Sequence, residues 1–142
     1  MTRITGSCHC GNLTYTLEWP EGEEVPLRRC GCSFCTRHGS IFTANAGAAL
    51  SGRVRDRAAL SLYTFATRTA DFFVCARCGA LPWVTSVIEG RTYAAVNANT
   101  FDVPARATVA PLRSFDGEPV EDRLARRKRT WIATVHIAFE AG

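Results

Sequence analysis

The sequence predicts one small domain that is mainly β, built from short antiparallel strands around bound metal, with one short helix near its C-terminal end. Three observations predict this class. Apolar and polar residues alternate at both ends of the chain, short β-branched or aromatic runs fill the middle, and seven cysteines fall in tight groups. A length of 142 residues with 46% hydrophobic content suits a single domain over residues 1–142.

The expected strands follow from the spacing of apolar side chains. Leu13, Tyr15, Leu17 and Trp19 alternate with polar residues, which predicts a half-buried strand over residues 13–19. A last strand is expected over residues 131–139, where apolar residues again alternate. Between them, short segments separated by Gly, Asn, Arg-rich or Asp-containing breaks are expected to be strands at residues 41–44, 60–65, 71–74, 81–88 and 92–96.

Two segments are expected to be helical, one turn after Ser33 and residues 119–128. In the second, acidic residues lie near the start and basic residues at the end, as the helix dipole favours. Without this basic group, 12 basic residues remain against 13 acidic ones, so the net charge of +4 comes from one place and a nucleic-acid partner is not expected. An acidic partner is the alternative role for the group, which comprises Arg123, Arg126, Arg127, Lys128 and Arg129.

The cysteines are spaced as metal ligands. Cys-x-Cys and Cys-x-x-Cys spacings bring thiolate sulfurs together in pairs, as a zinc ion with Zn–S bonds of about 2.3 Å requires. Four thiolates close a structural zinc site, and three with an open fourth position hold a catalytic zinc. The seven cysteines form three groups: Cys8 and Cys10; Cys30, Cys32 and Cys35; Cys75 and Cys78.

A disulfide framework is the main alternative to metal binding. Against it, the cysteine count is odd, and residues 1–6 contain no apolar run typical of a secretory signal. We therefore expect a cytoplasmic location and bound metal. The spacings do not fit the usual iron–sulfur motifs, and no stretch is long and apolar enough for a membrane span.

Local geometry is also predicted around the cysteines. Cys8 and Cys10 are expected on a strand, where residues two apart share a face and His9 points away. Cys75 is expected to end a strand, with Cys78 following a two-residue turn and Gly79 supplying a positive φ.

The ordered motifs Gly6-Ser7-Cys8-His9-Cys10-Gly11, Cys30-Gly31-Cys32-Ser33-Phe34-Cys35 and Cys75-Ala76-Arg77-Cys78-Gly79 resemble the glutathione-dependent formaldehyde-activating enzyme family, whose domain also occurs in centromere protein V. Residues 96–102 are similar to a Val-Asn segment of that family; its polar residues, Asn97, Asn99 and Asp102, are interpreted as turn formers. The resemblance covers residues 4–110, and residues 111–142 match loosely.

This resemblance implies a β-tent fold of small antiparallel sheets organised around two zinc ions. It assigns Cys8, Cys10, Cys75 and Cys78 to a structural zinc. It assigns Cys30, Cys32 and Cys35 to a second, catalytic zinc with an open coordination position.

The resemblance also implies a reaction. Glutathione would bind at the open position as a thiolate and add to formaldehyde, and the reverse reaction would cleave a carbon–sulfur bond. We therefore expect a carbon–sulfur lyase that acts on a small-molecule thiol and on formaldehyde or another small electrophile. The alternatives are a noncatalytic, zinc-stabilised binding module and a thiol redox sensor.

Cationic side chains beside the cysteines are candidates for glutathione binding. Arg28, Arg29, Arg37 and Arg77 adjoin the clusters in sequence and would pair with the two carboxylates of glutathione, unless they are solvated surface residues. His38 would be a proton shuttle or a fourth zinc ligand, unless it is an ordinary loop histidine.

Overall fold

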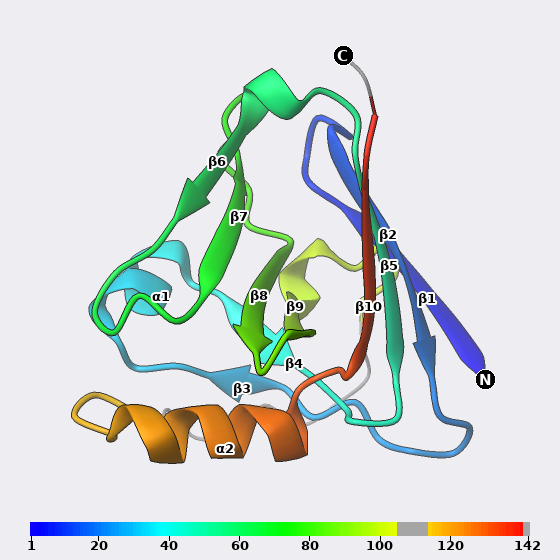
Figure 1. Cartoon of the computed structure of the whole chain (residues 1–142). Helices are drawn as coiled ribbons and strands as arrows, with labels where there is room; N and C mark the ends of the chain where they lie inside the picture. The colour runs from blue at the N-terminus through cyan, green and yellow to red at the C-terminus, as the bar shows by residue number, and fades with distance from the viewer. Residues whose placement is uncertain (105–113, 141–142) are drawn as a thin grey trace.

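Two β-sheets form the body of the protein in the computed structural model, which describes residues 1–104 and 114–140. In Figure 1 the sheets lean toward each other at the top and spread apart below, like the sides of a tent. The four-stranded sheet has the order β1 (Thr2–Ser7), β2 (Leu13–Trp19), β5 (Ala49–Val54) and β10 (Thr134–Phe139). The six-stranded sheet has the order β3 (Arg28–Arg29), β4 (Ile41–Thr43), β9 (Arg91–Asn97), β8 (Trp83–Ile88), β7 (Asp71–Cys75) and β6 (Leu60–Tyr63).

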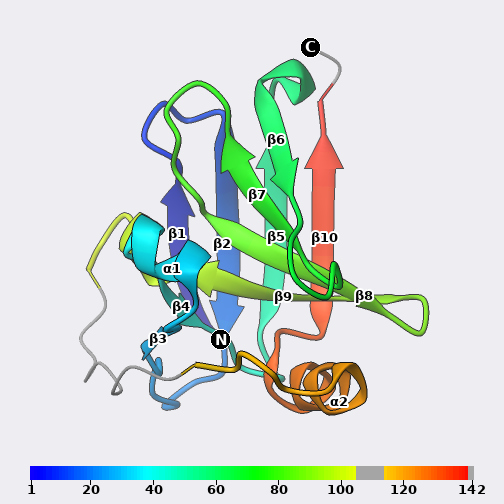
Figure 2. The same cartoon turned by 90° about the vertical axis from the view of Figure 1, so that its left-hand side faces the viewer.

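Two α-helices accompany the sheets. The short α1 (Ser33–His38) lies beside the six-stranded sheet, and α2 (Val120–Thr130) lies across the open lower end of the tent (Figures 1 and 2). Single 3-10 turns occur at Arg57–Ala59 and Ala98–Thr100. Neither α1 nor α2 is long and apolar enough to cross a membrane.

The predicted mainly β fold with a short C-terminal helix is confirmed. Residues 13–19 form β2 with the expected alternation of fully and partly buried side chains. The segments expected around residues 41–44, 60–65, 71–74, 81–88 and 92–96 correspond to β4, β6, β7, β8 and β9. Both helices are present, and α2 has Glu121 and Asp122 in its first turn and basic residues in its last.

The sequence did not predict three of the strands, nor the pairing of the last one. The edge strands β1 and β3 are largely exposed, so they carry little of the apolar alternation that marks a strand. In β5 a glycine, Gly52, stands where an apolar residue would complete the pattern. The last strand begins at Thr134 rather than residue 131, and it pairs parallel to β5 because the chain returns to the sheet from α2. The other strand pairs among the described residues are antiparallel, so the prediction of a mainly antiparallel fold is confirmed.

The two sheets meet at Trp83 of β8. Its indole is fully buried and packs edge-on against Tyr15 of β2, with ring centroids 6.1 Å apart. Gly52 of β5 makes room for it, since a Cβ there would lie 3.1 Å from the indole and 2.9 Å from Ile137. The missing side chain at residue 52 therefore lets the sheets approach.

We expect Gly52→Ala to lower the free energy of unfolding by about 1–3 kcal/mol, because the added methyl group overpacks the contact between the sheets. Urea unfolding followed by tryptophan fluorescence measures the change. Gly47→Ala is the control, since a Cβ at residue 47 meets its nearest neighbours only at 3.4 Å. Equal stability of the two variants would contradict the role given to Gly52.

Candidate metal centres and the adjoining cavity

Four cysteines from two distant turns meet between the sheets, and we call them the four-cysteine cluster. Cys8 and Cys10 lie in the turn after β1, and Cys75 and Cys78 lie at and beyond the end of β7. Their sulfur atoms all lie within 4.8 Å of one another. The cluster therefore links one strand of each sheet.

The prediction that Cys8 and Cys10 lie on a strand was wrong. β1 ends at Ser7, and the chain turns tightly, with Gly11 at φ +83° and its N–H donating to the carbonyl of Cys8 over 3.2 Å. This turn, rather than strand alternation, brings the two sulfurs to 3.8 Å. The prediction for the other pair is confirmed: Cys75 ends β7, and Gly79 at φ +80° donates its N–H to the carbonyl of Cys75.

The four-cysteine cluster fits a tetrahedral metal ion. Zn–S bonds of about 2.3 Å place neighbouring sulfurs of a tetrahedron about 3.8 Å apart. Cys8 and Cys10 match this spacing at 3.8 Å, and the sulfurs of Cys10 and Cys75 lie 3.5 Å apart. The donor set and its size therefore suit zinc with no rearrangement of the backbone.

The thiols of this cluster differ in pKa. Burial raises the pKa of Cys8 to about 12. Burial also opposes ionisation of Cys78, but backbone hydrogen bonds from Ala80 and Cys10 lower its pKa to about 6. One thiolate is thus favoured near neutral pH, and a cation among the sulfurs would displace the remaining protons.

The other three cysteines form a second group, the three-cysteine cluster, within a single short segment. Cys30 follows β3, Cys32 caps the N-terminus of α1, and Cys35 lies in the helix, with all three sulfurs within 4.8 Å of one another. The Cys32 sulfur accepts a hydrogen bond from the Cys35 N–H over 3.3 Å, which orients both residues. A hydrogen bond with Cys35 lowers the pKa of Cys30 to about 6 and raises the pKa of Cys35.

Asn97 at the end of β9 braces the segment that follows α1. Its side-chain oxygen accepts the N–H of Ile41 over 3.2 Å, and its amide donates to the carbonyl of Leu81 over 2.9 Å. It also caps the following 3-10 turn, which confirms the turn-forming role expected for it. Asn99 donates to the carbonyl of Gly39 over 2.9 Å, directly after α1. The two side chains thus fix the helix of the three-cysteine cluster to the six-stranded sheet.

The three-cysteine cluster lines a cavity of about 660 Å³ between the six-stranded sheet and α2. Arg28 and Arg29 of β3 lie beside the cysteines in this lining. Apolar side chains from the six-stranded sheet and the end of α2 form much of the wall, among them Phe42, Phe72, Val84, Ala95 and Trp131. Three arginines of α2, Arg123, Arg126 and Arg127, complete it.

The other sequence-predicted candidates lie outside this lining. Arg37 donates to the carbonyl of Ser33 on its own helix over 3.0 Å, and Arg77 forms an ion pair with Asp56. His38 is exposed and packs against Phe34, with ring centroids 4.6 Å apart. Among the described residues, His38 is not part of either group whose ligand atoms could share a metal.

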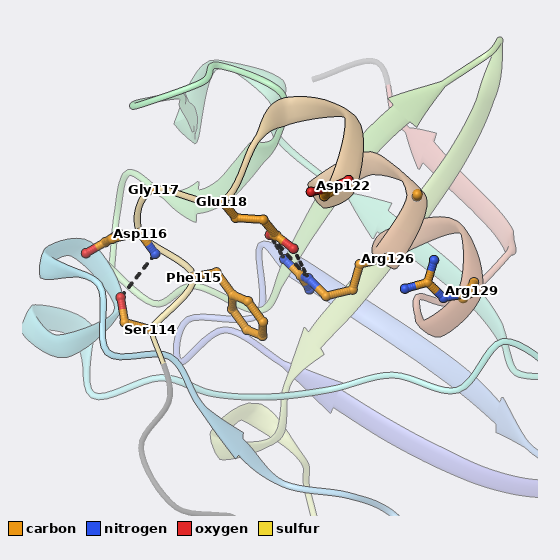
Figure 3. Close-up of a pocket in the computed structure, with 9 residues that line it drawn as sticks. Ser114, Phe115, Asp116, Gly117, Glu118, Asp122, Arg126 and Arg129 are labelled. Atoms are coloured by element: carbon orange, nitrogen blue, oxygen red, sulfur yellow. Dashed lines mark hydrogen bonds and ion pairs between the residues drawn. The ribbon is translucent and has the colours of Figure 1, made fainter.

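The basic group on α2 is largely engaged with the protein itself. Arg126 pairs with Glu118 at 3.0 Å, as Figure 3 shows, and Lys128 pairs with Glu89 at 3.0 Å. Arg127 is only 6% exposed and donates to Thr69 and Ser86. A hollow of about 570 Å³ lies beside the Glu118–Arg126 pair, and it shares residues 115–118 and Arg126 with the cavity. Figure 3 draws the residues that line this hollow.

Sequence reasoning missed the contribution of α2 to the cavity. The basic residues lie some ninety positions after the three-cysteine cluster, and a charge-balanced helix end explains them without any site. The sequence signal available was Arg127 itself, which falls on the apolar side of an otherwise charged helix.

The fold and the site define a class: a small, mainly β protein with two cysteine clusters, each able to hold a metal ion. The chain belongs to the glutathione-dependent formaldehyde-activating enzyme family, because residues 3–115 match that family. The extent agrees with the resemblance seen over residues 4–110, and the boundary expected near residue 111 lies outside the described residues.

A crystal structure of a Rhodobacter sphaeroides protein is similar to this chain. The two share 25% sequence identity, the match covers 95% of this chain and 98% of that one, and the TM-score is 0.50. The likeness thus extends over nearly the whole of both chains. No curated protein matches the chain.

We expect Asn97→Ala to lower the free energy of unfolding by about 1–3 kcal/mol, because it leaves the part-buried amide of Ile41 and the buried carbonyl of Leu81 without their partner. Thermal or urea unfolding measures the loss. Asn99→Ala, at an exposed position, is the control and should change stability much less. A greater loss in the control would contradict the bracing role of Asn97.

Proposed function

We propose that this protein is a zinc-dependent carbon–sulfur lyase, which forms or cleaves the adduct of glutathione with formaldehyde or a similar small electrophile. One observation carries the proposal: the three-cysteine cluster lines the cavity, whereas no residue of the four-cysteine cluster is among the described residues that line it. The two clusters therefore differ in access as well as in ligand number.

The difference between the clusters supports two roles. Four sulfurs satisfy a tetrahedral ion completely, so the four-cysteine cluster would hold a structural zinc between the sheets. Cys30, Cys32 and Cys35 would hold the second zinc, which keeps a fourth position open and would supply chemistry by lowering the pKa of an incoming thiol. These three residues are the ones to which we assign the catalytic role.

Arg28 and Arg29 are placed to bind the cosubstrate. Both line the cavity beside Cys30, on a strand that pairs only with β4 and leaves their side chains exposed. Guanidinium groups bind carboxylates through paired hydrogen bonds, and glutathione carries two carboxylates. Arg37 and His38, on the same short helix as Cys35, stay predicted contacts. A reaction that needs reduced thiols and glutathione also supports a cytoplasmic location.

We expect the purified protein to hold two zinc ions per chain, one for each cluster. Cys32→Ala should reduce this to one without unfolding the protein, because only the local cluster is broken. Cys75→Ala should remove the other ion and lower the melting temperature, because the metal link between the two sheets would be lost. Elemental analysis with circular dichroism measures both. Unfolding of Cys32→Ala would show that its cluster is structural.

We expect the protein to accelerate formation of the glutathione–formaldehyde adduct above the spontaneous rate, measured by NMR exchange. Cys32→Ala should reduce the catalysed rate by at least about a hundredfold, because a catalytic metal contributes several kcal/mol to the barrier. Arg28→Gln with Arg29→Gln should raise KM for glutathione more than it lowers kcat. Arg77→Gln, outside the cavity, is the matched control. A rate no greater than the spontaneous one would refute the proposal.

A further inference from the structure

The cavity is much larger than formaldehyde requires. Its volume is about 660 Å³, within the range of about 300–1,000 Å³ in which proteins bind drug-sized ligands. Formaldehyde is little larger than a water molecule, which takes about 30 Å³ in the liquid. Glutathione would fill part of the space, and the nature of the walls indicates what would fill the rest.

The wall between the cysteines and α2 is apolar. Small side chains at Ala70, Val84 and Ala95 form its buried floor, and the partly exposed rings of Phe42 and Phe72 stand over them with centroids 6.4 Å apart. Glutathione is polar along its whole length, and its amides would lose hydration against this wall without gaining hydrogen bonds. An apolar body, of the size of an aromatic ring, suits the wall better.

The far end of the cavity carries positive charge in a buried position. The guanidinium of Arg127 lies over the ring of Trp131 at 4.9 Å, and its hydrogen bonds go to neutral oxygens of Thr69 and Ser86. Its Nε has no hydrogen-bond partner among the residues that the structure describes. Burial, together with the charges of the nearby Arg123 and Arg126, lowers the pKa of Arg127 to about 10.

The acidic residues around the cavity compensate this charge only in part, through Glu118. Glu118 is engaged by both nitrogens of Arg126 at 3.0–3.2 Å, and it lies 4.0 Å from the Nε of Arg123. Asp116 is exposed, and its negative charge opposes ionisation of Cys30 at the cysteine end of the cavity. A buried cation beside two more cations, with the nearest carboxylate already held by Arg126, favours the binding of an additional anion.

Resting on the lyase function proposed above, we propose that the electrophile is an aldehyde with an apolar, ring-sized body and a carboxylate, which Arg127 and Arg123 bind while its carbonyl meets the thiol beside the three-cysteine cluster. The sulfur–carbon bond forms as the carbonyl π bond breaks, and the thiol proton ends on the new hydroxyl oxygen. The reaction is a hemithioacetal addition, so nothing is oxidised or reduced. The carboxylates of glutathione go to Arg28 and Arg29.

The experiment uses a probe that cannot react, so that binding is tested apart from lyase activity. Isothermal titration of the zinc-loaded protein with 4-(hydroxymethyl)benzoate should show binding, at least about tenfold tighter than benzyl alcohol, which lacks the carboxylate. Arg127→Gln, which keeps a donor for Thr69 and Ser86, should weaken binding of the acid by about ten- to a hundredfold and leave benzyl alcohol unchanged. Arg129→Gln is the matched control on the exposed side of α2 and should change neither.

A second variant tests the apolar wall and covers the case in which Arg127→Gln fails to fold. Ala44→Leu narrows the cavity without altering charge and should weaken both aromatic probes while leaving glutathione binding unchanged. Equal affinity for the acid and the alcohol, or a folded Arg127→Gln that binds the acid normally, would overturn the proposal. The proposal would also be overturned if glutathione displaced the aromatic acid completely and Arg127→Gln abolished glutathione binding. Arg127 would then bind a carboxylate of glutathione and not one of the electrophile. If neither formaldehyde nor 4-carboxybenzaldehyde is turned over while the probe still binds, the lyase function is refuted and only the carboxylate-binding site at Arg127 stands.

Discussion

The rest of the structure depends on the convergence of four sulfur atoms from turns that lie 65 residues apart in the chain. The sulfurs of Cys10 and Cys75 lie 3.5 Å apart; Cys10 lies in the turn after β1 of one sheet, and Cys75 ends β7 of the other. Bare thiols held this close do not stabilise a small fold by themselves, since burial opposes their ionisation and their mutual hydrogen bonds are weak. A cation bound by all four would turn this arrangement into a strong link between the sheets. Two contacts therefore hold the sheets together. One is the four-cysteine cluster, whose strength depends on a bound cation, and the other is the apolar packing of Trp83 against Gly52.

The two cysteine clusters differ in how far the chain must fold to assemble them. The three-cysteine cluster is made within six residues and needs only a cap and one helical turn, whereas the four-cysteine cluster needs both sheets. Loss of the local cluster is therefore expected to leave the long-range contacts of the fold in place. The cluster at the cavity could then vary with little effect on the free energy of unfolding.

Most of the fold followed from period-two alternation and from short β-branched or aromatic runs, and cysteine spacing predicted metal binding, because these signals are local. The grouping of the cysteines into four and three followed from the family resemblance instead. β2 and the turn at Cys75–Gly79 were predictable from local signals. Features set by tertiary contacts were not. Gly52 interrupts the apolar alternation of β5, because the indole of Trp83 lies where a side chain at residue 52 would be. The turn that joins Cys8 to Cys10 cannot be distinguished by sequence from a strand of the same spacing. Arg127 resembles any basic residue near a helix end until the structure shows it buried against Thr69 and Ser86.

The parallel pairing of β10 with β5 has a consequence for how this protein can diverge. It fixes the C-terminal end of α2 to the four-stranded sheet, so the cationic end of the cavity is encoded by a stretch of chain that contains no cysteine. Substitutions in this C-terminal stretch can therefore change the charge at that end of the cavity without altering either cysteine cluster.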